Sequence, residues 1–223
     1  MSAFVSFTQS DRVVLFTDGA AYDDDGVLRA VVDKVYRATV PLAITALGNH
    51  EIGRRIAGFI VKEANRLGVD GLIDSGLNLL LSGLIEIGGW EEQPTLFHIA
   101  AWSPLRGAFH VGFQTVDEDD IKAFQLRELA DSVIRGPEFP IELAAMFEPS
   151  PGGDAVAEFG SFCMGAMRNT MSVPLGRPDA EPRYLVGGHV DMTVVDGSGV
   201  RTERVIDWQD RCGEFIEPMR SAA

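Results

Sequence analysis

The chain has 223 residues, a formal net charge of −14 and an isoelectric point of about 4.6. A hydrophobic content of 46% supports a sizeable core, and we expect a single domain spanning residues 1–223. The acidic balance, without any Lys/Arg cluster, argues against nucleic acid and anionic membranes as partners.

Cysteine usage and the chain start bear on the cellular compartment. Cys163 and Cys212 lie far apart and outside any CxxC spacing, which predicts neither a disulfide framework nor a zinc site. A reducing, cytoplasmic location fits this pattern. The first residues lack a basic segment followed by an apolar run, so we expect no signal peptide. The apolar stretch 72–90 contains Asp74, Glu86 and four glycines, which favours a buried helix over a membrane span.

Strand patterns dominate the first 48 residues. Apolar and polar residues alternate at 5–8, as in a half-buried strand, and a continuous apolar run at 13–16 is typical of a strand buried on both faces. The pair Asp18-Gly19 ends that run. Further strands are expected over 31–40 and over 42–47, the latter ending at Gly48.

The hydrophobic period then changes to that of a helix. Ile52, Ile56 and Ile60 share one helical stripe, with Asn49 as the expected N-cap and Gly68 just past the expected end. Later elements follow from similar patterns: a helix around 77–85, a hairpin of strands 96–102 and 108–116, helices over 121–135 and 154–171, and a closing hairpin of strands 184–195 and 200–206.

This order alternates groups of strands with pairs of helices. Because neighbouring strands are close enough to form hairpins, the sheets should be mostly antiparallel. We therefore predict an α+β fold, a four-layer αββα sandwich in which two stacked sheets are each flanked by a helix pair.

Four residues within this framework suggest chemistry. Asp18 follows Ser2 by 16 positions, Lys34 follows Asp18 by 16, and Gly48 follows Lys34 by 14. If Met1 is removed, Ser2 carries a hydroxyl nucleophile and a free α-amine that can serve as its base. A nearby Lys34 ammonium would disfavour protonation of that amine, and Asp18 would hold the lysine. The backbone N–H of Gly48 could donate to a developing oxyanion.

These intervals and their surroundings resemble the proteasome-like branch of the N-terminal nucleophile hydrolases. The resemblance is best over residues 2–67; it includes the apolar run 13–17 before Asp18, the Asp33-to-Tyr36 segment and, later, the Gly187-Gly188 pair. It implies hydrolysis of a peptide or small amide substrate without a cofactor or metal. Catalytic roles would fall on Ser2, Asp18, Lys34 and Gly48. Members of this branch form rings, so a homo-oligomer is also implied.

Two other functions stay open. Ala20 stands where the family commonly has Arg, and Arg183 to Val186 stand where it keeps a polar pair near the terminal amine. These departures, or a retained Met1, would favour a non-catalytic assembly or scaffold protein. The third possibility is a small-molecule amidase of the wider superfamily.

Other motifs are interpreted as structural. The acidic run Asp23 to Asp25 lacks the spacing of a calcium loop and reads as a solvated turn. His98 and His110 lie on the two arms of the predicted hairpin and could approach each other, but they have no metal-binding partner in view. Cys163 lies on the apolar stripe of a helix and is expected in the core.

Overall fold

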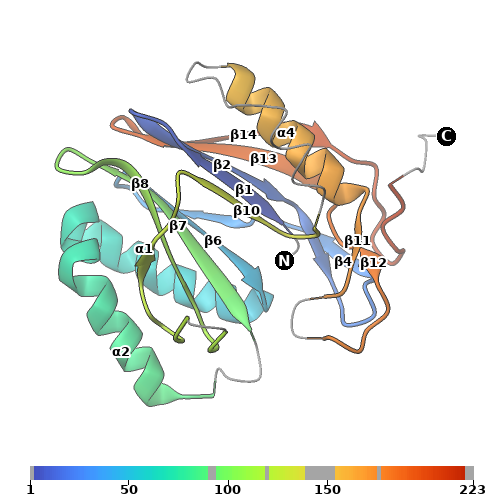
Figure 1. The fold of residues 1–223 in the computed structure, drawn as a ribbon, viewed down its shortest axis with the longest axis horizontal. Helices are drawn as coiled ribbons and strands as arrows, with labels where there is room; N and C mark the ends of the chain where they lie inside the picture. The colour runs from blue at the N-terminus through green and yellow to red at the C-terminus, as the bar shows by residue number, and fades with distance from the viewer. Residues whose placement is uncertain (1–2, 90–93, 119–120, 139–153, 175–176, 219–223) are drawn as a thin grey trace.

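The computed structural model describes residues 3–89, 94–118, 121–138, 154–174 and 177–218. Within these ranges the protein is a mixed α+β structure built on antiparallel sheets, as predicted (Figure 1). Two five-stranded sheets form its centre, and two further strand pairs lie outside them.

The first sheet has the strand order β10-β1-β2-β13-β14. Its members are β10 (Ser132–Arg135), β1 (Phe4–Thr8), β2 (Arg12–Asp18), β13 (His189–Asp196) and β14 (Gly199–Asp207). The central strand β2 pairs Phe16 with Val5 on one side and with Met192 on the other. The beginning of the chain is thereby placed beside a strand from near its end.

The second sheet has the strand order β5-β6-β7-β8-β9. Its members are β5 (Val35–Arg37), β6 (Leu42–Gly48), β7 (Thr95–Ser103), β8 (Gly107–Gln114) and β9 (Arg127–Glu128). The hairpin of β7 and β8 confirms the sequence prediction. Two strand pairs complete the set: β3 (Ala20–Tyr22) with β4 (Leu28–Val31), and β11 (Met171–Ser172) with β12 (Arg183–Tyr184).

The two large sheets pack face to face. One buried cluster joins Phe4 and Leu15 of the first sheet to Leu47 of the second. Another joins Val13 and Val195 to Ala43 and Ala100. Apolar burial of this kind is the main favourable term in folding, so the contact between the sheets is a core of the molecule.

Helices α1 (His50–Gly71) and α2 (Leu77–Ile87) lie over the second sheet, joined by the π-helical turn η1 (Leu72–Gly76) (Figure 1). The expected stripe of Ile52, Ile56 and Ile60 packs into a core cluster with residues of β6 and β7. The Asn49 side chain accepts a hydrogen bond from the Ile52 amide at 3.0 Å, which confirms the predicted N-cap.

The end of α1 differs from the prediction. Gly68 has φ 75°, but it forms a kink inside the helix, which continues to Gly71. By length and composition alone, the helical stretch His50–Ile87 could cross a membrane. The core helix of a globular domain meets the same criterion, and the buried residues of α1 pack on the sheet in that manner.

Helix α4 (Asp154–Arg168) covers the opposite face of the first sheet (Figure 1). Phe159, Cys163 and Met167 pack there against Phe16 and Val190. Burial raises the pKa of the Cys163 thiol to about 11, consistent with its predicted place in the core.

The helix predicted over 121–135 is wrong. That stretch contains the short strands β9 and β10, and β10 pairs with β1 so that Arg135 lies opposite Phe4. The β-branched pair Val133-Ile134 suits a strand, and the deciding contact comes from the distant chain start. Among the described residues, α4 is therefore the helix on the first sheet, without the second member of the predicted pair.

Candidate functional site

Asp18 and Lys34 form a buried ion pair. Asp18 is the last residue of β2 and Lys34 lies just before β5, so each side chain is held at a strand end. The Lys34 Nζ lies 2.7 Å from Oδ1 of Asp18, and the two side chains are 1% and 0% exposed. The sequence prediction that these two residues meet is confirmed.

Main-chain amides surround the Asp18 carboxylate. Oδ1 accepts a hydrogen bond from the Ala3 N–H at 3.2 Å, in addition to the bond from Lys34. Oδ2 accepts from the N–H groups of Ala20 at 3.1 Å and Gly187 at 3.3 Å. Such charge-assisted bonds compensate a carboxylate for lost hydration, which explains how Asp18 is tolerated without exposure.

Lys34 is constrained at both its side chain and its backbone. Burial lowers the pKa of its ammonium, and the Asp18 carboxylate partly offsets that change. The Thr45 hydroxyl donates to the Lys34 carbonyl oxygen at 3.0 Å. This ammonium therefore has a fixed position and a pKa closer to neutrality than that of a solvated lysine.

The described chain begins at this ion pair. Ala3 is fully buried, and its amide nitrogen is the one that donates to Asp18. Ser2, the predicted nucleophile, lies outside the described residues. The structure thus brings together Asp18, Lys34 and Ala3, the residue that follows Ser2 in the sequence.

Gly48 ends β6 one residue before the N-cap of α1. Its φ is 120°, and a Cβ at this position would lie 2.2 Å from the carbonyl oxygen of Pro94. Only glycine fits both the backbone conformation and the space. Because Val35 pairs with Thr45, Gly48 lies on the strand next to Lys34, in the strand-to-helix turn that was predicted.

A second buried ion pair holds the loop that contacts Asp18. The Arg168 guanidinium of α4 donates to both carboxylate oxygens of Asp210 at 2.8 and 2.7 Å, and to the Val186 carbonyl at 3.1 Å. Asp210 also accepts from the Gly188 amide at 2.7 Å. These bonds position the adjacent Gly187 amide against Asp18. Sequence reasoning missed this support because Arg168 and Asp210 lie 42 positions apart.

Three residues have ligand atoms close enough together to hold a metal ion: Asp33, His189 and Asp191. Arg204, however, lies among them. It bonds Asp191 at 3.1 Å and His189 at 3.2 Å, and its guanidinium is 3.6 Å from Asp33. A fixed positive charge at this place opposes a second cation, so the cluster is best described as an ion-pair network.

His98 and His110 meet between the two sheets, as their hairpin placement allowed. His98 Nε2 lies 3.2 Å from His110 Nδ1, which is also 3.2 Å from the Ser6 hydroxyl, and His110 Nε2 contacts the Thr8 hydroxyl. Burial lowers the pKa of His98 well below its usual value and that of His110 to about 4. Both rings are therefore neutral at pH 7.

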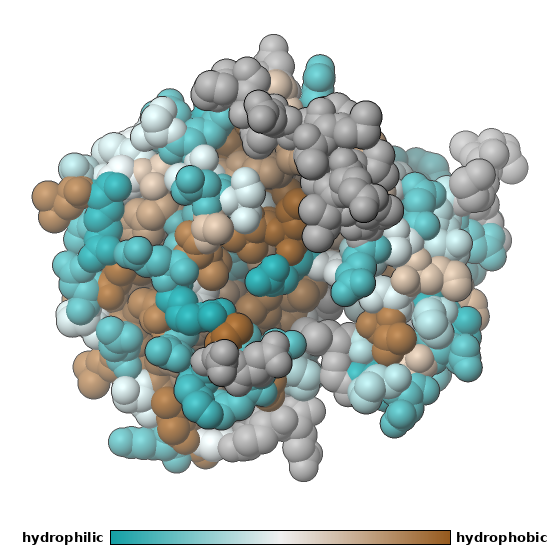
Figure 2. Space-filling model, in the orientation of Figure 1, coloured by the Kyte–Doolittle hydropathy of each residue, from teal (hydrophilic) through white to brown (hydrophobic). Residues whose placement is uncertain are grey.

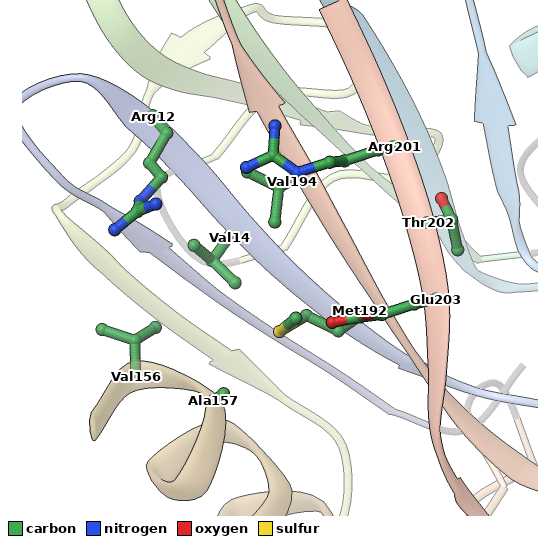
Figure 3. Close-up of a pocket in the computed structure, with 9 residues that line it drawn as sticks. All are labelled: Arg12, Val14, Val156, Ala157, Met192, Val194, Arg201, Thr202 and Glu203. Atoms are coloured by element: carbon green, nitrogen blue, oxygen red, sulfur yellow. The ribbon is translucent and has the colours of Figure 1, made fainter. Parts of the chain in front are cut away.

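The outer face of the first sheet carries a cavity of about 370 Å³ beside α4 (Figure 3). Val14, Met192 and Val194 form its floor, with Arg12 and Arg201 above them. Both arginines are engaged elsewhere, Arg12 with Gln9 and Arg201 with Asp196. Asp18, Lys34 and Gly48 are not among the described residues that line this cavity, which separates it from the Asp18 centre.

The acidic turn behaves as the sequence suggested. Asp23 Oδ1 accepts from the amides of Asp25 and Val27, and Oδ2 accepts from Arg29 at 2.7 Å. Both carboxylate oxygens of Asp23 therefore accept hydrogen bonds from neighbouring residues of the turn.

Comparison of the sequence with models of known protein families finds no match, and comparison with curated proteins finds no significant relative. Function must therefore be argued from the geometry around Asp18.

Proposed function

We propose that the protein is an N-terminal nucleophile hydrolase that cleaves amide bonds, with peptides as the first substrate class. One observation carries the proposal: the Ala3 amide and the Lys34 ammonium both lie within 3.2 Å of the same Asp18 oxygen. The residue preceding Ala3 is Ser2, so removal of Met1 would create a free α-amine one peptide unit from this centre.

In the proposed reaction the Ser2 hydroxyl attacks the substrate carbonyl carbon while the α-amine accepts its proton. An α-amine has an ordinary pKa of about 7.7–8.0, and a nearby ammonium lowers it further, so a larger fraction is available as base. The amine product leaves with that proton, and water then hydrolyses the ester left on Ser2. Lys34 supplies the positive charge, and Asp18 holds it in place.

Gly48 has the proposed role of oxyanion donor through its backbone N–H. Its glycine-only conformation at a strand-to-helix turn supports this role, since a side chain there would collide with Pro94. One well-placed donor of this kind contributes roughly 2.7–4 kcal/mol to stabilising the transition state.

The proposal extends to the fold. Two sheets that pack face to face, with α1 and α2 outside one and α4 outside the other, agree with the four-layer αββα arrangement of the resembled family. Assembly into a homo-oligomer, a ring included, belongs to the same proposal. Leu79 and Ile87 of α2 are 78% and 74% exposed and could contribute to such an interface.

The decisive experiment combines intact-mass measurement with covalent labelling by a peptide β-lactone. We expect the purified protein to lack Met1 and to gain one probe adduct, which Ser2→Ala abolishes. Ser198→Ala, in the exposed turn between β13 and β14, is the matched control and should label normally. Retention of Met1, or undiminished labelling of Ser2→Ala, would contradict the assignment.

A specific observation favours the scaffold protein as the second candidate. Val186 is fully buried in an apolar cluster, and Arg183 lies over the Phe215 ring at 5.1 Å. Neither residue offers the hydroxyl or carboxylate that the resembled family keeps near its terminal amine. If Met1 is retained, the same fold serves assembly rather than hydrolysis. A small-molecule amidase remains the third candidate, distinguished by its substrate.

A further inference from the structure

A second cavity of about 540 Å³ lies between the edges of the two sheets. Its lining combines polar and apolar side chains, and the apolar ones include Phe4, Phe97, Leu129 and Val133. In Figure 2 hydrophobic residues gather near the middle of the visible face, where Figure 1 shows β1 and β7 near each other. A cavity with this volume and lining is suited to a small organic group.

This cavity adjoins the candidate catalytic centre. Phe4 follows Ala3, whose amide binds Asp18, and Leu47 precedes Gly48. Pro94 and Thr95 also line the cavity, and they are the residues that a Cβ on Gly48 would meet. A substrate whose carbonyl reached Gly48 could therefore place a neighbouring group in this space.

Two arginines of the lining have no ion-pair partner within the described ranges. Arg127 comes from β9, and its buried Nε has no hydrogen-bond partner there. Arg135 comes from β10, opposite Phe4, and donates only to the adjacent Ile134 carbonyl among the described residues. In a chain with net charge −14, where most other described arginines bind a carboxylate, such a pair indicates a ligand anion.

A fully buried histidine also lines the cavity. His98 uses Nε2 for its bond to His110, while its buried Nδ1 has no hydrogen-bond partner in the described part of the chain. Buried polar atoms are normally paired, so an unpaired one beside a cavity points to a polar group on the ligand. Burial keeps this ring neutral, so it adds no charge to the site.

We infer that this cavity binds a carboxylate carried on an apolar body, with Arg127 and Arg135 holding the anion and His98 a neighbouring polar group. The inference rests on the proposed function only in making that carboxylate part of the substrate. The substrate class is then a peptide or acyl amino acid whose free carboxylate lies close to the bond that is cleaved.

The charges of the lining favour a single carboxylate over a polyanion. Glu118 and Glu138 also line the cavity, so they balance the two arginines in formal charge. A polyanion would meet both glutamates, whereas one carboxylate can be bound by the planar donors of a guanidinium. The apolar side chains of the lining further favour an organic acid over a free inorganic anion.

Direct binding tests this inference without using catalysis. The probes are N-acetylphenylalanine and its uncharged counterpart N-acetylphenylalaninamide, titrated calorimetrically into the full chain carrying Ser2→Ala. We expect the carboxylate probe to bind at least about tenfold more tightly than the amide, because hydrogen bonds to a charged group contribute that much. Arg127→Gln and Arg135→Gln should each remove that preference.

The control is Arg211→Gln, an exposed arginine outside the cavity lining, which should keep the preference. Circular dichroism confirms that each variant is folded, and the exposed Arg135 provides a test if the Arg127 variant fails to fold. Equal binding of the two probes, no binding of either, or a preference unchanged in both cavity variants overturns the inference. Because hydrolysis is not measured, this outcome is independent of the Ser2 labelling result.

Discussion

Two of the polar centres buried in the described part of the molecule, Asp18–Lys34 and His98–His110, tolerate burial in different ways. The Asp18–Lys34 centre keeps a charged pair, and the carboxylate accepts hydrogen bonds from the amides of Ala3, Ala20 and Gly187. The His98–His110 centre is neutral, since burial lowers both pKa values. Charge persists on Asp18, which has a paired ammonium and three main-chain donors, whereas for His110 burial outweighs the opposing effect of the Asp131 carboxylate and backbone on its pKa.

The largest effect should follow from breaking the charged centre. Asp18→Ala leaves the Lys34 ammonium buried without its carboxylate, and we expect a loss of about 3–5 kcal/mol in the free energy of unfolding. Urea denaturation at pH 7.5 measures this loss. Asp117→Ala is the control: it removes an exposed partner of Lys122 and should change little. Equal losses in the free energy of unfolding for the two substitutions would show that the buried pair stabilises the protein no more than the exposed one.

A smaller effect should follow from disturbing the backbone beside that centre. Gly48→Ala forces a Cβ toward Pro94 at a φ of 120°, and we expect destabilisation of roughly 1–3 kcal/mol. Gly58→Ala is the matched control within α1, because its Cβ would meet nothing within 4 Å. This helical substitution should stabilise the protein by roughly 0.5–1 kcal/mol. Thermal unfolding measures both changes in stability. If the two substitutions changed the stability in the same direction, the steric argument would be refuted.

The neutral centre should have an effect that is smallest at pH 7 and grows as the pH falls. The unfolded chain protonates these histidines near pH 6.5, whereas folded His110 resists protonation down to about pH 4. Stability should therefore fall with decreasing pH across this window, by up to about 1.4 kcal/mol per pH unit for each histidine. His98→Gln cannot titrate, and we expect a shallower acid slope in urea unfolding at several pH values.

His50 provides the comparison for this titration. It is exposed at the start of α1, and burial lowers its pKa less completely than that of the two interior rings. His50→Gln should leave the acid slope closer to that of the unmodified protein. A slope reduced more by His50→Gln than by His98→Gln would contradict the neutral state assigned to the interior pair.

The sequence predicted those parts of the fold that depend on the local periodicity of apolar residues and on the spacing of turn and cap residues. The stripe of α1, its Asn49 cap and the β7–β8 hairpin follow from short patterns. The meeting of Asp18 and Lys34 followed from the residue spacing of the resembled family, supported by the strand boundaries on either side. Ser2 stays a prediction, because it lies outside the described residues.

Other features depend on contacts that no local pattern reveals. Residues 132–135 become a strand because they pair with β1, a partner more than 120 positions away. The Arg168–Asp210 pair likewise forms only in the folded chain, and so does the cavity that brings together Arg127 and Arg135, which have no ion-pair partner within the described ranges. A local reading identifies residue types, whereas the partners of these side chains are fixed only by the folded topology.

The Gly187 amide has a consequence for how the protein is made. It is one of the donors on Asp18, and it comes from the last fifth of the chain, whereas Ala3 comes from the very beginning. During synthesis the chain emerges from its N-terminus, so a ribosome-bound fragment shorter than this position holds an incomplete centre. Under the proposed function, chemistry at Ser2 would wait until residue 187 has been synthesised, which would keep the hydrolase inactive while the preceding chain is still unfolded.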